Sequence, residues 1–250
     1  QEVVQHLRNA METDKVSHAY IFEGEKGAGK KILARAFAKA LQCTGEGSRP
    51  CGTCRSCIQT DSHNHPDIME VTHDKPNTIG VDDIREQVVA DAQVRPYSSR
   101  YKIYIIPEAE KMNPQAQNAL LKTIEEPLEY VIILLLTTNT FSLLPTIRSR
   151  CVTLNMKPVP NEEVRRYLME HVKSPDYEAD ICVAFAQGNI GKAMMMADLE
   201  DFSLQQRLVL RIVKHVHEME IYEVTSAVKE LQAYKDEMDR ILELMTVWYR

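Results

Sequence analysis

The sequence contains no apolar run long enough to cross a membrane. A membrane-spanning helix needs about 18 or more predominantly apolar residues, whereas the longest apolar run, Tyr130–Leu136, is short and indicates a buried strand. No secretory signal is visible, so we expect a cytoplasmic protein with no membrane partner. The chain begins at Gln1 rather than Met and stops at Arg250 inside a helical pattern. We interpret both ends as signs of an incomplete chain.

The sequence also lacks a large excess of charge of either sign. The 30 Lys and Arg residues against 36 Asp and Glu give a net charge of -6. A mildly acidic chain excludes a general nucleic-acid binder, although a local basic patch remains compatible with it. Internal repeats and low-complexity tracts are absent as well. The length of 250 residues and the hydrophobic content of 44% allow more than one domain.

Strand and helix patterns alternate along the first part of the chain. We expect strands at 19–23, 67–71, 102–106, 131–136 and 152–154, and helices at 30–41, 81–94 and 114–126. This alternation predicts an α/β fold, with a parallel sheet flanked by helices on both faces.

Strand patterns end after about Met156, where Pro158 and Pro160 mark a boundary. Further helices are expected at 161–172, 178–186, 191–198, 203–216 and 222–250. The chain is therefore predicted to hold an α/β domain, a small helical domain and the start of another helical segment.

A phosphate-binding pattern follows the first expected strand directly. Residues Gly24–Lys31 match seven of the eight positions of the P-loop pattern G-x-x-x-x-G-K-S/T, between a strand and a helix. The glycines Gly24, Gly27 and Gly29 allow backbone N–H groups to surround phosphate oxygens, and Lys30 would reach the β and γ phosphates. The competing interpretation is an ordinary glycine-rich turn.

Two groups that hold Mg²⁺ in an active P-loop ATPase are missing. The hydroxyl expected at the eighth position is replaced by Lys31, which cannot ligate a metal while it is protonated. At the end of the strand at 102–106, Pro107 stands where an Asp is expected, although Glu108 follows it. Phosphoryl transfer depends on positioning around this metal. We therefore expect hydrolysis to be strongly suppressed, and we leave ATP or ADP binding open.

Four of the six cysteines lie within a short segment. Cys43, Cys51, Cys54 and Cys57 have the spacing C-x7-C-x2-C-x2-C, and four thiolates at such a spacing suit a structural zinc ion. An iron–sulfur cluster and a redox dithiol are the alternatives. His63 and His65 are expected at the surface, and Cys182 in a core.

These pieces, in this order, resemble the delta-prime subunits of the bacterial DNA polymerase III clamp loader, within the AAA+ superfamily. The resemblance covers about residues 1–198. It rests on a cysteine knuckle after the P-loop helix, on the segment Asn118–Pro127, on Ser149-Arg150-Cys151 and on Gly188–Ala193. The implied organisation is an AAA+ P-loop domain over 1–157 with a zinc knuckle at 43–57, a helical lid over 158–202, and an incomplete helical collar over 203–250.

The resemblance implies roles for individual residues. Arg150 would be an arginine finger that reaches the ATP site of a neighbouring motor subunit, which suits a permanently charged, forked side chain. The alternative is an ordinary surface arginine. Thr138, between Thr137 and Asn139, would lie in the sensor-1 region, and Lys192 would stand near sensor 2, where active ATPases usually carry Arg. Glu108 would remain from the acidic motif of a degenerate nucleotide site.

The implied function is that of a non-hydrolysing stator subunit of the replicative clamp loader, which loads the sliding clamp onto primed DNA. Its partners would be the tau/gamma motor subunits and delta, with primed DNA bound without sequence specificity and the clamp contacted weakly or indirectly. Arg85, Arg95, Arg100 and Lys102 are candidate phosphate contacts. The chain would have no ATPase activity of its own, within a DNA-directed DNA polymerase holoenzyme (a nucleotidyltransferase) at the nucleoid-associated replisome. The alternative is an active motor ATPase of the tau/gamma type, which keeps the hydroxyl and the Asp that Lys31 and Pro107 replace.

Overall fold

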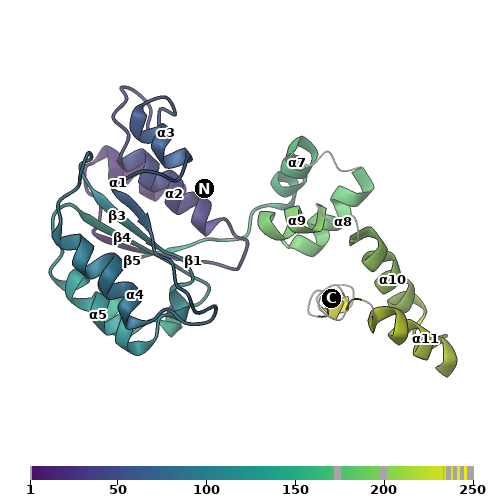
Figure 1. The fold of residues 1–250 in the computed structure, drawn as a ribbon. Coiled ribbons are helices and arrows are strands. Elements are labelled where there is room, and N and C mark those ends of the chain that lie inside the picture. Colours follow the sequence, from purple (N-terminus) through teal and green to yellow (C-terminus); the bar gives the residue numbers. More distant parts are fainter. Residues whose placement is uncertain are drawn as a thin grey trace. The chain divides into compact units, whose positions relative to one another are not determined.

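The computed structural model describes residues 2–171, 176–197 and 202–232, together with 234, 238, 241, 242, 245 and 246. The chain divides into two compact units, residues 1–157 and 158–250, which are described separately (Figure 1). No helix within the described residues is long and apolar enough to span a bilayer.

A five-stranded parallel sheet forms the centre of the first unit. The strands are β1 (Ala19–Glu23), β2 (Ile68–Glu70), β3 (Lys102–Ile106), β4 (Val131–Thr137) and β5 (Val152–Asn155), in the order β2-β3-β4-β1-β5. In the register of the sheet, Ile21 pairs with Leu135 of β4 and with Thr153 of β5. Because the strands are parallel, the ends of β1, β3 and β4 meet at one edge, where the phosphate loop begins.

Helices cover both faces of this sheet (Figure 1). The helices α1 (Glu2–Glu12) and α2 (Lys30–Leu41) pack on one face, against alternate strand residues such as Tyr20 and Ile105. The other face carries α4 (Val81–Ile84), α5 (Pro114–Glu125) and the short α6 (Pro145–Arg148), packed against residues such as Ile21 and Tyr104. This alternation follows from the period of two along a strand. The predicted α/β fold is confirmed.

Some elements differ from the sequence-based expectation. The helix expected over 81–94 is α4, continued by a π-helical turn η1 (Arg85–Ala90) and a 3₁₀ turn η2 (Asp91–Gln93). Two more 3₁₀ turns, η3 (Ala109–Lys111) and η4 (Thr140–Ser142), follow β3 and β4. Three helices were not predicted: α1, α6 and the seven-residue α3 (Arg55–Asp61), which begins inside the cysteine segment.

The second unit is helical. It contains α7 (Asn161–His171), α8 (Asp176–Ala186), α9 (Ile190–Ala197), α10 (Phe202–His215) and α11 (Ile221–Gln232). Val164, Leu168 and Cys182 lie in its core, so the expected core position of Cys182 is confirmed. The single helix expected over 222–250 is wrong, because α11 ends at Gln232 and Tyr234 lies in a turn. Neither Gly nor Pro marks this end, and many residues after 232 fall outside the described ones.

Candidate functional site

The phosphate loop follows β1 and leads directly into α2. The N–H of Gly24 donates to Thr137 O at 3.2 Å, which ties the start of the loop to the end of β4. Gly27 and Gly29 have φ values of 88° and 83°, in the left-handed region that favours glycine. Gly29 caps the N-terminus of α2. The backbone therefore has the form of an anion cradle at a helix N-terminus.

The lysine of the P-loop pattern, Lys30, contacts the loop itself. Lys30 Nζ donates to Gly24 O at 2.5 Å and to Glu25 O at 2.8 Å. Burial lowers the pKa of Lys30, although the nearby carboxylates of Glu110 and Glu25 oppose the shift. The ammonium group thus binds carbonyl oxygens at the start of the loop.

Lys31 is engaged away from the cradle. It forms an ion pair with Glu70 at the end of β2, and Arg35, one turn further along α2, binds the same carboxylate. Although burial of Glu70 opposes the shift, these two cations hold its pKa below the ordinary value. The position that would carry the Mg²⁺-binding hydroxyl is therefore used for an ion pair between α2 and the sheet, and it does not fit a metal ligand.

The acidic residues after β3 differ in what they contact. Glu108 has a φ of 48°, is exposed, and accepts from Lys111 Nζ at 2.8 Å, which lowers its pKa. Glu110 instead accepts from Thr138 Oγ1 at 2.8 Å and acts electrostatically on Lys30. Among the expected site residues, Thr138 thus contacts Glu110, a residue that the sequence analysis missed. Its only signal was its place two residues after Glu108.

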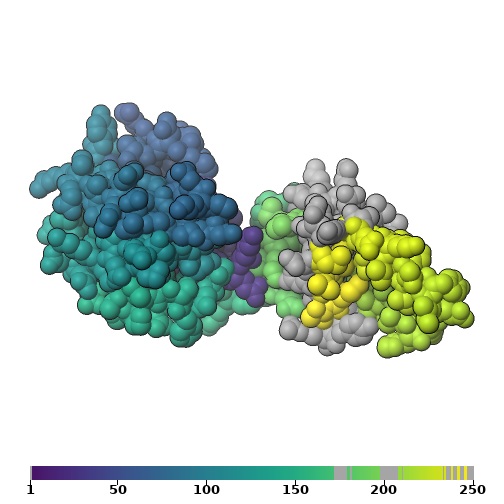
Figure 2. Space-filling model, turned by 60° about the horizontal axis from the view of Figure 1, so that its bottom comes forward, coloured from purple at the N-terminus to yellow at the C-terminus, as the bar shows by residue number. Residues whose placement is uncertain are grey.

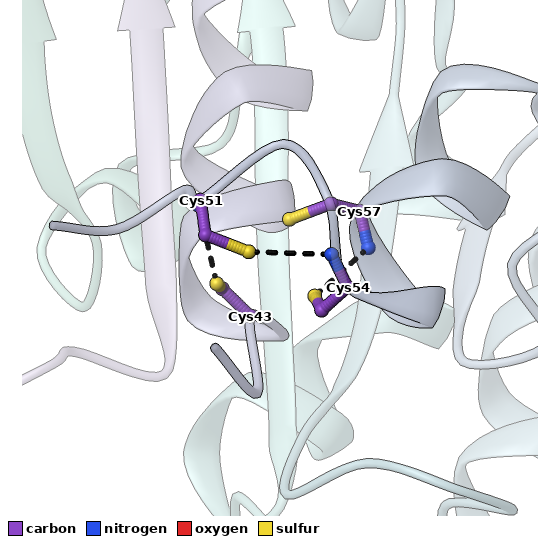
Figure 3. Close-up of side chains that lie close together, drawn as sticks. All are labelled: Cys43, Cys51, Cys54 and Cys57. Carbon is purple, nitrogen blue, oxygen red and sulfur yellow. Dashed lines mark hydrogen bonds between the residues drawn. The ribbon is translucent and has the colours of Figure 1, made fainter. Parts of the chain in front are cut away.

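The four cysteine side chains lie close together (Figure 3). They come from the end of α2, the following loop and the start of α3, and this blue segment stands out from the unit in Figure 2. All four are free thiols, and their sulfur atoms lie within 4.8 Å of one another. A tetrahedral ion with metal–sulfur bonds of about 2.3 Å needs sulfurs about 3.8 Å apart. The cluster therefore fits a metal ion.

Backbone N–H groups stabilise the sulfurs. The N–H groups of Cys51, Cys54 and Cys57 donate to Cys43 Sγ, Cys51 Sγ and Cys54 Sγ at 3.3, 3.3 and 3.4 Å. The side chain of Cys54 caps the N-terminus of α3. The hydrogen bond from the N–H of Cys57 lowers the pKa of the Cys54 thiol to about 5. Hydrogen bonds from Thr53 and Cys54 lower that of Cys51 to about 7, while burial raises that of Cys57 to about 12. Bound metal would favour the thiolate at all four positions.

Side chains outside the cluster attach it to the sheet. His65 is buried, not at the surface as expected, while His63 is exposed. The Asp67 N–H donates to His65 Nδ1 at 3.1 Å, so Nε2 carries the proton and faces Ser56 Oγ of α3 at 3.0 Å. On the other side, Lys39 Nζ of α2 contacts both carboxylate oxygens of Asp61 at 2.7 Å. The surface expectation was wrong because a short turn after α3 returns the chain to β2.

Arg150 lies at the surface of the first unit, after α6. Its Nη1 donates to Thr146 O at 3.0 Å and to Ser149 Oγ at 3.3 Å. Its Nη2 lies 3.2 Å from Glu125 Oε1, at the C-terminal end of α5. The guanidinium group is exposed. These partners, Thr146, Ser149 and Glu125, all lie outside the phosphate loop in sequence.

Of the four candidate DNA contacts, Arg85, Arg95 and Arg100 are exposed. Arg100 forms an ion pair with Asp14 at 2.7 Å. The expectation for Lys102 is wrong, because its ammonium is buried and lies 2.8 Å from Asp91 Oδ2. Lys192 belongs to the second unit, where its N–H donates to Asn189 Oδ1 at 3.1 Å.

Comparison with known sequences shows the protein family to which this chain belongs. The profile of the family described as DNA polymerase III, delta subunit, matches residues 1–160. The chain belongs to the delta-prime and gamma–tau family of DNA polymerase III clamp-loader subunits. DNA polymerase III subunit delta' of Bacillus subtilis is 33% identical over 217 residues, 86% of this chain and 64% of that protein. The tau/gamma subunit of Haemophilus influenzae is 34% identical over 204 residues, 79% of this chain but 29% of that protein.

Solved structures agree on the fold of this family. A DNA polymerase III gamma subunit-related protein from Thermotoga maritima superimposes with a TM-score of 0.57 at 22% identity, covering 96% of this chain and 77% of that one. The Holliday junction branch migration motor RuvB of the same organism gives 0.52 at 17% identity, covering 85% and 63%. These likenesses establish the AAA+-like fold. The resemblance to clamp-loader subunits expected from the motifs is confirmed.

Proposed function

We propose that this protein is the non-hydrolysing stator of a bacterial clamp loader. In this role it organises, with delta and the tau/gamma motor subunits, the pentameric ring that loads the sliding clamp onto primed DNA. The observation that carries the proposal is the loss of both metal-positioning groups: Lys31 is paired with Glu70, and Pro107 occupies the position of the Asp. Without them, Mg²⁺ cannot be held between the β and γ phosphates.

The catalytic contribution would be made at another subunit's ATP. Arg150 is exposed and keeps the delocalised charge and forked donors that suit phosphate oxygens. We assign it the role of an arginine finger in trans. A degenerate nucleotide site would remain in the cradle formed by Gly24, Gly27, Gly29 and Lys30. The family resemblance adds Thr138 and Glu108 to this site.

The second unit would supply the assembly parts of the subunit. We assign residues 158–202 to the lid, with Lys192 near the sensor-2 position, and residues 203–250 to the start of the collar. Part of this region lies outside the described residues. Exposed Arg85, Arg95 and Arg100 are the remaining candidates for contact with the phosphate backbone of primed DNA. Such a subunit would work in the bacterial cytoplasm at the replisome.

Zinc is the metal proposed for Cys43, Cys51, Cys54 and Cys57. Four sulfur ligands leave no open position, which is typical of structural zinc. The zinc ion would have a structural role: it would link the end of α2 to α3 and stabilise the segment at 43–57. Metal analysis should give about one zinc per chain and no iron absorbance; iron would support the iron–sulfur alternative.

An active tau/gamma-type motor is the second candidate, because relatives of both kinds match at similar identity, 34% for tau/gamma and 33% for delta'. The two are separated by assaying the purified chain with Mg²⁺ and ATP, alone and after co-purification with the other loader subunits. The stator should assemble but show no turnover of its own. Turnover by the isolated chain that Lys30→Ala abolishes would contradict the stator and support the motor.

A further inference from the structure

The backbone at Arg150 is fixed by buried residues in the same turn. Ile147 of α6 is fully buried, and the thiol of Cys151 packs against the same core, where burial raises its pKa to about 12. Backbone hydrogen bonds also bridge this turn, from Arg150 N to Ile147 O at 3.1 Å. The polypeptide on both sides of Arg150 is therefore anchored, and only its long side chain remains to be placed.

One carboxylate of the same chain contacts the guanidinium group. Glu125 Oε1 lies 3.2 Å from Arg150 Nη2, and the side chains are 44% and 41% exposed. Glu125 is the last residue of α5, where the helix dipole also favours a cation. Thr146 O accepts from Nη1 on the other side. Within the described residues, no hydrogen bond engages the Nε–H, which therefore stays available to a phosphate oxygen.

We infer that Glu125 is a positioning residue for Arg150, holding the guanidinium group at the end of α5 before it meets a neighbour's phosphate. The inference rests on the proposed arginine-finger function. A long arginine side chain loses conformational entropy when it is immobilised. Because Glu125 already restricts the Arg150 side chain, less entropy is lost when the side chain binds phosphate. Because the pair is half exposed, its strength is modest, and it leaves the donors that bind phosphate in place.

The test is the ATPase activity of the assembled loader carrying Glu125→Ala. We expect kcat to fall about two- to fivefold, the effect of an exposed ion pair, with little change in KM for ATP. Glu125→Gln keeps an oxygen acceptor and should recover part of this loss. In the Arg150→Ala background, Glu125→Ala should have no further effect, since Glu125 acts through Arg150.

The matched control is Glu126→Ala, which removes the same charge from the adjacent exposed residue, one that makes no ion pair within the described chain. It should turn over ATP like the wild type, and size-exclusion chromatography should show full assembly for every variant. If Arg150→Ala impairs turnover but Glu125→Ala behaves like Glu126→Ala, the positioning role is wrong and the proposed function stands. Faster turnover by Glu125→Ala would also contradict positioning. If Arg150→Ala itself has no effect, the arginine finger fails first.

Discussion

Lys31, at the position where a P-loop carries its metal-binding hydroxyl, forms an ion pair with Glu70 at the end of β2. Arg35 contacts the same carboxylate, and Lys39 contacts Asp61 of α3. These three cations recur every four residues, so they lie on one face of α2. The helix that in an ATPase would support the metal here joins the sheet and the cysteine segment.

Restoring the hydroxyl alone should not create an ATPase. Lys31→Thr leaves Pro107 in place of the Asp, so we expect no Mg²⁺-dependent turnover. It should cost less than about 1 kcal/mol of stability, because the lost ion pair is partly exposed and Arg35 still neutralises Glu70. Adding Pro107→Asp should give nucleotide binding that EDTA weakens, measured with a fluorescent nucleotide. ATP hydrolysis by Lys31→Thr alone would contradict the account.

Gly45 should be required for metal binding. A Cβ at this position would lie 2.5 Å from Cys51 Sγ and 2.9 Å from Cys51 Cβ, so Gly45→Ala must displace a ligand. We expect the variant to bind zinc much more weakly, as measured by competition with a chromogenic chelator.

Gly47→Ala provides the control for this substitution. Its φ is 93°, but an added Cβ would meet no atom within 4 Å. It should cost about 1 kcal/mol of backbone strain and keep its zinc. Equal zinc affinity of Gly45→Ala and the wild type would show that the cluster is not the metal site.

Acid should weaken the attachment of α3 through His65. Burial lowers the pKa of this imidazole below its ordinary value of 6.5, so the folded state favours the neutral form. The resulting stability is present above the unfolded pKa and is lost as the pH falls below about 6.5 towards the folded pKa. Protonation would also place a hydrogen on Nδ1, against the Asp67 N–H.

Thermal unfolding between pH 7.5 and 5 measures this effect. His65→Gln should be less stable at neutral pH but should lose less stability on acidification than the wild type. His63→Gln, at an exposed position, should keep the wild-type profile. Because zinc release by acid affects all three proteins, the difference between their profiles isolates His65. Parallel profiles for His65→Gln and the wild type would contradict the prediction.

The sequence predicted the sheet well because its strands are apolar and its breaks are marked. Lys102–Ile106 and Ala19–Glu23 are buried strands with the expected bounds, and Pro127 follows the helix that ends at Glu125. The α/β class and the cysteine cluster could be predicted for the same reason: the signals are local. Helix α3 escaped prediction because its N-cap is a cysteine, a residue that the spacing had already assigned to metal.

The parts that could not be predicted depend on contacts between distant residues. No local pattern pairs Lys31 with Glu70 or buries His65 beside Ser56. Lys102 appeared as a basic candidate for DNA, yet its position in a central strand buries it against Asp91. Likewise, Glu110 rather than Glu108 meets Thr138 because the 3₁₀ turn after β3 sets the direction of both carboxylates.

The central claim is that the catalytic contribution of this subunit is made through Arg150 to another subunit's ATP. The most direct measurement is single-turnover ATP hydrolysis by the reconstituted loader carrying Arg150→Ala, beside a loader carrying Lys30→Ala in this subunit. An arginine finger is worth about a thousandfold or more in rate. We predict that Arg150→Ala slows one class of ATP site by about this factor with assembly intact, while Lys30→Ala leaves hydrolysis unchanged. Wild-type hydrolysis with Arg150→Ala, or its loss with Lys30→Ala, would contradict the account.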